Sequence, residues 1–232
     1  MKTIYNGRSK MADLISENYN MLLLMNRFGI PLGVGEKSIA EVCRENSVDL
    51  ETFLYVVHYL SSRTTGDNMD LHRRISIPQL IVYLRNSHDY FLHYRLPELR
   101  SKLLNALEEA PQDVVYVIIK FFDEYEDEVR KHMSYEDKYV FPYATKLING
   151  EKDSKYNIDI FRKKHDQIEL KIKELKNILI KYYPTQSGYK LHSVLYDIFA
   201  CQIELYDHNH VEDHVFIPAV AKLEEEMSDS LV

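Results

Sequence analysis

The chain has 232 residues, which suits one or two domains with a substantial buried core. Its 45% hydrophobic and 28% charged residues, with seven glycines and seven prolines, are typical of a helix-rich globular protein. A formal net charge of -7 argues against nucleic acid or an anionic membrane surface as a partner.

Cysteine use and the N-terminus indicate where the chain works. Cys43 and Cys201 are isolated and form no CxxC pair, so the sequence predicts neither a disulfide framework nor a thiolate zinc site. This pattern fits a reducing compartment, and we predict a cytoplasmic protein. The longest apolar run near the polar N-terminus, residues 21–25, is too short for a signal peptide or a membrane span, so we expect no membrane partner.

Residues 1–66 are predicted to form a small helical domain. Three short helices are expected at residues 12–28, 37–46 and 50–60, the last with Asp49 as its N-cap. The polar stretch that follows predicts a linker at residues 67–76.

Four long amphipathic segments occupy residues 77–226, without strand-like alternation. The first three start at Ser76, Pro111 and about Ile158, and the fourth follows a turn at residues 184–188. We expect three prolines to interrupt, bend or end these helices: Pro97, Pro142 and Pro218. Short connections between four such helices predict an all-α fold with an antiparallel four-helix bundle.

One block of sequence occurs twice in these helices. The pair His132 and Glu136 recurs 76 residues later as His208 and Glu212, and each pair is followed by an acidic residue and a proline. Upstream of each pair lies a His-Asp dipeptide, with an offset of 77 residues. The duplicated unit therefore supplies six candidate ligands: His88, His132, Glu136, His165, His208 and Glu212.

All six fall on the interior faces of the predicted helices. In the third helix the interior positions are three or four residues apart and His165 fills one, while His208 and Glu212 fill two adjacent positions of the fourth. Buried carboxylates need a compensating positive charge, and no Lys or Arg occupies the interior positions around them. Four imidazoles and two carboxylates suit two ions of iron, manganese or zinc.

Simpler interpretations apply to the single motifs. One buried His is usually a packing residue, and one HxxxE motif is usually a surface pair, so the sixfold repeat on interior faces carries the metal hypothesis. His210 should face outward, and His93 and His192 stay open as a seventh ligand. Three carboxylates are candidates for orienting the ligands, although a solvent-facing role is the commoner one: Asp89, Glu128 and Asp166.

The duplicated pattern resembles that of hemerythrin-like domains and differs from the ExxH pairs of ferritin-like di-iron proteins. The whole chain resembles the repair of iron centres family, whose members join a small N-terminal helical domain to a hemerythrin-like bundle. Besides the two HxxxE blocks, the resemblance rests on residues 28–30, 38–43 and 96–99. It implies two iron ions, oxo- or hydroxo-bridged, held by the same six residues, with Glu136 and Glu212 as bridging carboxylates.

One element of that family is missing. Its members usually carry a Cys-Cys-Gly-Gly sequence in the N-terminal loop, where this chain has Gly33-Val34-Gly35-Glu36. The resemblance implies repair of iron–sulfur clusters damaged by nitrosative or oxidative stress, through donated iron, with iron–sulfur proteins as partners and O2 or NO as small ligands. Two alternatives stay open: a hemerythrin-like protein that binds or senses O2 or NO, and a di-iron reductase of NO or peroxide.

Overall fold

Helices make up the regular structure of the chain in a computed structural model that describes residues 5–62, 75–151, 156–162, 168–182 and 188–229. Within these ranges no strand forms, and the predicted all-α class is confirmed. None of the described helices combines the length and the apolar character needed to cross a membrane.

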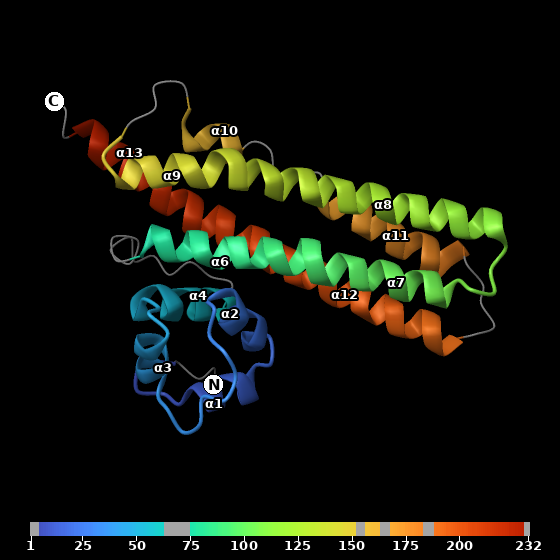
Figure 1. Cartoon of the computed structure of the whole chain (residues 1–232), viewed down its shortest axis with the longest axis horizontal. Helices are drawn as coiled ribbons and strands as arrows, with labels where there is room; N and C mark the ends of the chain where they lie inside the picture. Colours follow the sequence, from blue (N-terminus) through green and yellow to red (C-terminus); the bar gives the residue numbers. More distant parts are fainter. Residues whose placement is uncertain (1–4, 63–74, 152–155, 163–167, 183–187, 230–232) are drawn as a thin grey trace. The chain divides into compact units, whose positions relative to one another are not determined.

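The helices come in two groups along the chain (Figure 1). The label η marks a π-helical turn. The first group is short: α1 (Met11–Glu17), α2 (Met21–Arg27), α3 (Ile39–Glu45) and α4 (Leu50–Ser62). The second group is formed by α6 (Ile77–Tyr90), η1 (Phe91–Arg95), α7 (Leu96–Ala106), α8 (Gln112–Tyr135), η2 (Glu136–Val140), α9 (Phe141–Ile148), α10 (Ile158–Arg162), α11 (Ile168–Tyr182), α12 (Gly188–Val211), η3 (Glu212–Phe216) and α13 (Ile217–Asp229).

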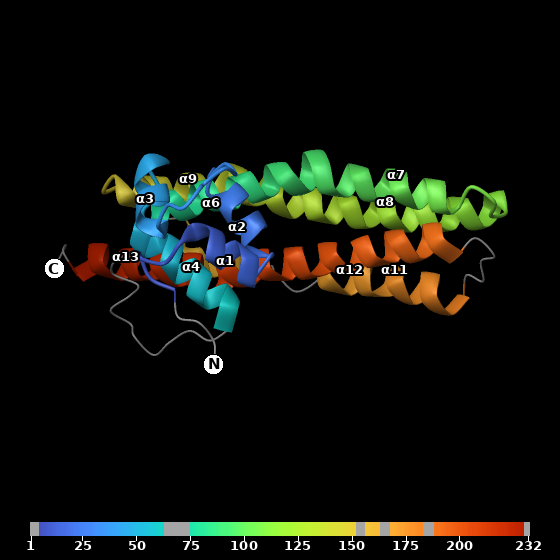
Figure 2. The ribbon, with the colours of Figure 1, turned by 90° about the horizontal axis from the view of Figure 1, so that it is seen from below.

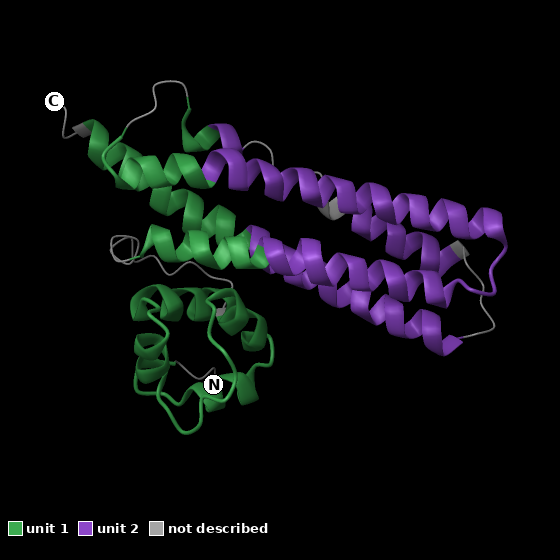
Figure 3. Ribbon diagram, in the orientation of Figure 1, with its two compact units in different colours: residues 1–87, 141–159, 210–232 green, residues 88–140, 160–209 purple. Residues whose placement is uncertain are grey.

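The chain divides into two compact units (Figure 3). Unit 1 combines residues 1–87, 141–159 and 210–232, and unit 2 combines residues 88–140 and 160–209. The N-terminal helices therefore share a unit with the first part of α6 and with α9 and α13.

Unit 2 is an antiparallel four-helix bundle. In both views, α7, α8, α11 and α12 lie side by side within this unit, and α8 contacts both α7 and α11 (Figures 1 and 2). The predicted interior positions of the fourth helix are all buried here: Leu191, Val194, Ile198, Cys201 and Leu205. They join a core that also holds Phe91, Phe122 and Tyr125.

The N-terminal helices follow the prediction except at one break. Residues 12–28 were expected to form one helix, but α1 ends at Glu17 and α2 begins at Met21. Between them the side chain of Asn18 accepts a hydrogen bond from the Asn20 N–H at 3.2 Å, a local turn that competes with the helix. Further along, α3 opens with a capping box between Ser38 and Glu41.

The N-terminal helices contact α6 inside unit 1. Arg27 donates to the Tyr83 hydroxyl at 3.1 Å, and the Asn86 side chain donates to the Arg27 carbonyl at 2.8 Å. The ring of Phe28 lies 5.0 Å from that of Tyr83. These contacts fix α2 against the turn of α6 that comes directly before His88.

A π turn precedes each of the three helix prolines. The turns η1, η2 and η3 end two residues before Pro97, Pro142 and Pro218, respectively. Proline lacks an N–H, and its ring clashes with the carbonyl four residues earlier, which lies inside the π turn each time. The longer i to i+5 hydrogen bonds of the π turn accommodate this clash. The prolines interrupt the α-helical hydrogen bonding, as predicted, but the helical path continues through them.

The separability of residues 1–66 stays a prediction, and a shortened chain that begins at Met69 tests it. We expect this chain to stay helical and to unfold cooperatively, because the buried core cluster described in unit 2 begins at Phe91. Its midpoint of thermal unfolding should fall below that of the full chain, since Tyr83 and Asn86 lose their contacts with Arg27 and Phe28. Circular dichroism measures both quantities, and a shortened chain without cooperative unfolding would contradict the prediction.

Candidate metal centre

The three π turns also mark the predicted ligands. Glu136 and Glu212 are the first residues of η2 and η3, each one turn after the His of its HxxxE pair. His88 lies in the last turn of α6, three residues before η1 begins. Such turns are frequent at functional sites because they redirect the side chains of a helix.

The carboxylate of Glu136 lies at the middle of the site in unit 2. It is fully buried. Its Oε2 lies 2.8 Å from Nε2 of His88, and its Oε1 lies 2.7 Å from Nε2 of His132. One carboxylate thus joins two imidazoles that come from two different helices.

A third imidazole comes from α12. His208 is completely buried, and its ring centroid lies 5.3 Å from that of His88, edge-on at 72°. One donor atom from each of His88, Glu136 and His208 lies within 4.8 Å of the others. The bundle therefore brings together residues that are up to 120 positions apart in the sequence.

Two predicted ligands remain. Glu212 is buried with 1% of its surface exposed, and it lies one turn after His208 at the start of η3. His165 lies outside the described residues, as does its neighbour Asp166. The short α10 that precedes His165 carries Phe161, whose ring stacks on that of His132 with centroids 6.2 Å apart.

Asp137 orients one of the imidazoles. Its Oδ2 lies 3.1 Å from Nδ1 of His88, while Nε2 of the same ring faces Glu136. A carboxylate on the second ring nitrogen fixes the tautomer and orientation of a ligating histidine and increases its basicity. Asp137 is not among the residues predicted from the sequence, although the repeated acidic residue after each HxxxE glutamate was a signal for it.

Burial and charge act in opposite directions on these groups. Burial raises the pKa of Glu136, but the interactions with His132 and His88 outweigh it and hold the pKa well below 4.5. Burial lowers the pKa of His88, but Asp137 and Glu136 outweigh it and raise the pKa to about 9. A metal ion that binds His88 at neutral pH must therefore displace a proton.

The other polar candidates face away from this group. The carboxylate of Asp89 pairs with His93 at 2.8 Å, and the two side chains are 78% and 69% exposed. Glu128 pairs with Lys131 at the surface, and His192 is exposed. Asp89 and Glu128 are therefore surface residues and do not contact the described ligands.

The chemistry of the donors fits a transition metal. Imidazole nitrogens and a carboxylate, placed together in a buried setting, are the ligand types that iron, manganese and zinc prefer. Calcium and magnesium prefer a shell of oxygen atoms. Metal charge would also offset the cost of burying the carboxylate.

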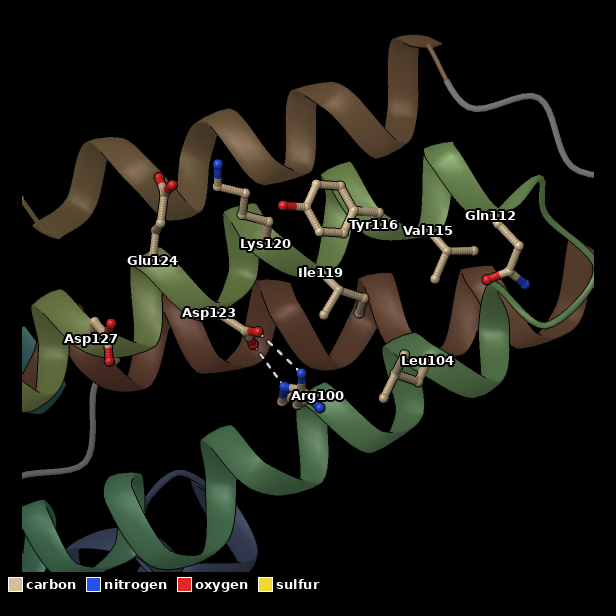
Figure 4. Close-up of a pocket in the computed structure, with 10 residues that line it drawn as sticks. All are labelled: Arg100, Leu104, Gln112, Val115, Tyr116, Ile119, Lys120, Asp123, Glu124 and Asp127. Carbon is tan, nitrogen blue, oxygen red and sulfur yellow. Dashed lines mark hydrogen bonds and ion pairs between the residues drawn. The ribbon is translucent and has the colours of Figure 1, made fainter.

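A separate surface pocket in unit 2 holds none of the six predicted ligands (Figure 4). It is lined by residues of α7 and α8, and Arg100 forms a bidentate ion pair with Asp123 across it, at 2.7 and 3.1 Å. Its remaining polar residues are Gln112, Tyr116, Lys120, Glu124 and Asp127. This lining provides no imidazole for a metal ion.

Two comparisons with known proteins match the chain. Residues 79–220 match a family described as the hemerythrin HHE cation binding domain. Over 216 residues, the chain is 22% identical to the "Iron-sulfur cluster repair protein ScdA" of Staphylococcus haemolyticus, an alignment that covers 90% of this chain and 96% of that protein. Both findings confirm the resemblance predicted from the duplicated histidines and glutamates.

The contact between Asp137 and His88 predicts the effect of one substitution. Asp137→Asn should weaken metal binding about 10- to 100-fold, because the amide no longer holds the imidazole in its basic, oriented form. Asp89→Asn is the matched control, since this neighbouring carboxylate contacts only the exposed His93 among the interactions described. Competition with a coloured chelator measures the affinity, and equal affinities of the two variants would contradict the assigned role of Asp137.

Proposed function

We propose a function that proceeds from one established fact: the chain belongs to the hemerythrin HHE cation-binding domain family. The protein holds two iron ions, and the ligands are the six repeated residues: His88, His132, Glu136, His165, His208 and Glu212. The convergence of His88, Glu136 and His208 within 4.8 Å supports this set. Glu212 enters it as the repeat counterpart of Glu136, and His165 as the counterpart of His88.

The proposed activity is the repair of iron–sulfur clusters damaged by nitrosative or oxidative stress, by donation of iron. The observation that supports it is the similarity to a protein named for iron–sulfur cluster repair. The alignment covers 96% of that protein and 90% of this chain. When bound, the iron would supply an exchangeable metal ion and a redox-active centre. The candidate ligands would bind it, Asp137 would hold the His88 ring in its ligating orientation, and burial would exclude water.

The bundle alone must supply this chemistry, because the chain offers no reactive thiol in its described part. Burial raises the pKa of Cys43 and that of Cys201 to about 12, so both stay protonated and unreactive. In the loop after α2, Gly33 and Gly35 have φ angles of 91° and 59°, which only glycine adopts without strain. A cysteine at either position would be strained.

A sensing function is the second candidate, and one contact favours it. The ring of Tyr59, at the end of α4, stacks on that of His214 with centroids 5.9 Å apart. His214 lies in η3, the turn that begins with the proposed ligand Glu212. If binding of O2 or NO moved this turn, the contact between His214 and Tyr59 would change, and the movement would reach the N-terminal helices. Reduction of NO or peroxide is the third candidate, and turnover of either compound would identify it.

The metal content of four variants tests the ligand set. The parent, purified without chelator, should hold two irons per chain, and Glu136→Ala and Glu212→Ala should each lose iron. His210→Ala should keep both irons, because this ring contacts the exposed His214. Elemental analysis with Mössbauer spectroscopy measures metal number and type. Iron loss in His210→Ala without loss in His208→Ala would show that the wrong face of α12 had been assigned.

Reactivation of a cluster enzyme damaged by nitric oxide tests the activity. Iron-loaded protein should restore more activity than an equal amount of free ferrous iron. The double variant Cys43→Ser, Cys201→Ser should match the parent, because both thiols are buried and protonated. An inactive parent that binds O2 or NO reversibly would favour sensing, and loss of activity in the double variant alone would show that thiol chemistry is required.

A further inference from the structure

A continuous series of aromatic rings leads from a candidate ligand to the surface of unit 2. The ring of His208 lies 5.9 Å from that of Phe91, and the ring of Phe91 lies 5.3 Å from that of Tyr90. The Tyr90 ring lies in turn 5.8 Å from that of Tyr94, which is 58% exposed. Each separation is a contact distance for aromatic rings.

The phenol in the middle of this series has a fixed proton acceptor. The Tyr90 hydroxyl donates to Oε2 of Glu204 at 3.0 Å. The buried Arg95 holds the same carboxylate at both oxygens, with its Nε and Nη2 at 3.1 and 3.2 Å, and Nη2 also donates to the Asp197 carbonyl. Glu204 is thus locked toward Tyr90 in a charge-assisted network.

These observations have a chemical consequence. Oxidation of a phenol is easiest when its proton can leave together with the electron, and a hydrogen-bonded carboxylate accepts that proton. Electron transfer also weakens steeply with distance, so rings in contact favour a sequence of short steps. Tyr90 has both features, whereas the exposed Tyr116 of α8 has no described contact with the series.

We propose that Phe91, Tyr90 and Tyr94 form an electron-transfer route between the metal centre and the surface, with Tyr90 as its redox-active residue and Glu204 as its proton acceptor. The proposal rests on the proposed iron site. It adds an activity to that site: one-electron oxidation of tyrosine, which protects the ligands when an oxidant is reduced beside them.

The electrons balance with hydrogen peroxide as the oxidant. Reduction of one peroxide molecule to two waters takes two electrons and two protons. Bound ferrous iron would supply one of these electrons, Tyr90 would give the other and become a neutral phenoxyl radical, and the two protons would come from solvent. The phenolic proton of Tyr90 moves to Glu204. When Tyr94 then gives an electron to Tyr90, the proton returns from Glu204, Tyr94 releases its own proton to solvent, and the radical has reached the surface.

Freeze-quench electron paramagnetic resonance tests the route on the full chain. Protein loaded with ferrous iron is mixed with one equivalent of hydrogen peroxide, and ring-deuterated tyrosine is used to identify a tyrosyl signal by its narrowing. The parent and the control Tyr116→Phe should give this signal, and Tyr90→Phe should lose it. Glu204→Gln should also lose it, because the amide is a poor proton acceptor. Mass spectrometry should find oxidised Tyr94 in the parent but not in Tyr90→Phe.

Iron content and thermal unfolding are measured for every variant, so that a failure of the route differs from a failure of the iron site. Tyr90→Phe keeps the ring and its packing, and it should keep the iron of the parent. A parent that holds iron but forms no tyrosyl radical would overturn the route and leave the iron site standing. A radical that persists in Tyr90→Phe would overturn it too. A parent that holds no iron would contradict both the proposed function and the electron-transfer route.

Discussion

A fully buried carboxylate is the most costly feature of unit 2, and much of the site exists to compensate for it. Glu136 stays charged only because His88 and His132 contact its two oxygens at 2.8 and 2.7 Å. Desolvation of a lone carboxylate would otherwise favour its protonated form. The apolar core keeps water away, so the same burial that costs stability also makes each contact with Glu136 strong. A cation among these donors would remove the remaining imbalance, and the candidate ligands follow the same helical periodicity as the core residues.

The position of the two repeated glutamates depends on the backbone as well as on side-chain packing. Pro142 and Pro218 follow Glu136 and Glu212 by six residues, and each forces a π turn that begins at the glutamate. Pro97 does the same for the turn that begins at Phe91, the ring between His208 and Tyr90. The duplication therefore preserved a carboxylate together with the turn that aims it.

The sequence predicted the features that depend on one helix at a time. Periodicity placed Cys201 and His208 on the buried face of α12, and both are completely buried. It could not show the contact between His88 and Asp137, because these residues are 49 positions apart and lie on different helices. Their contact depends on how those helices pack. The apolar periodicity also predicted one continuous helix across Asn18. In the structure the side chain of Asn18 forms a local turn there, and this turn separates α1 from α2.

The placement of oxidisable side chains distinguishes two kinds of redox chemistry. The chain has two cysteines and 18 tyrosines, and both cysteine thiols are buried, with pKa values raised to about 12. A protonated, enclosed thiol is a poor nucleophile and a poor target for oxidants. Tyr90, by contrast, combines a ring contact toward His208 with a hydrogen-bonded carboxylate, and its neighbour Tyr94 reaches solvent. An oxidant reduced beside the candidate ligands would therefore take an electron from a tyrosine phenol more readily than from a cysteine thiol.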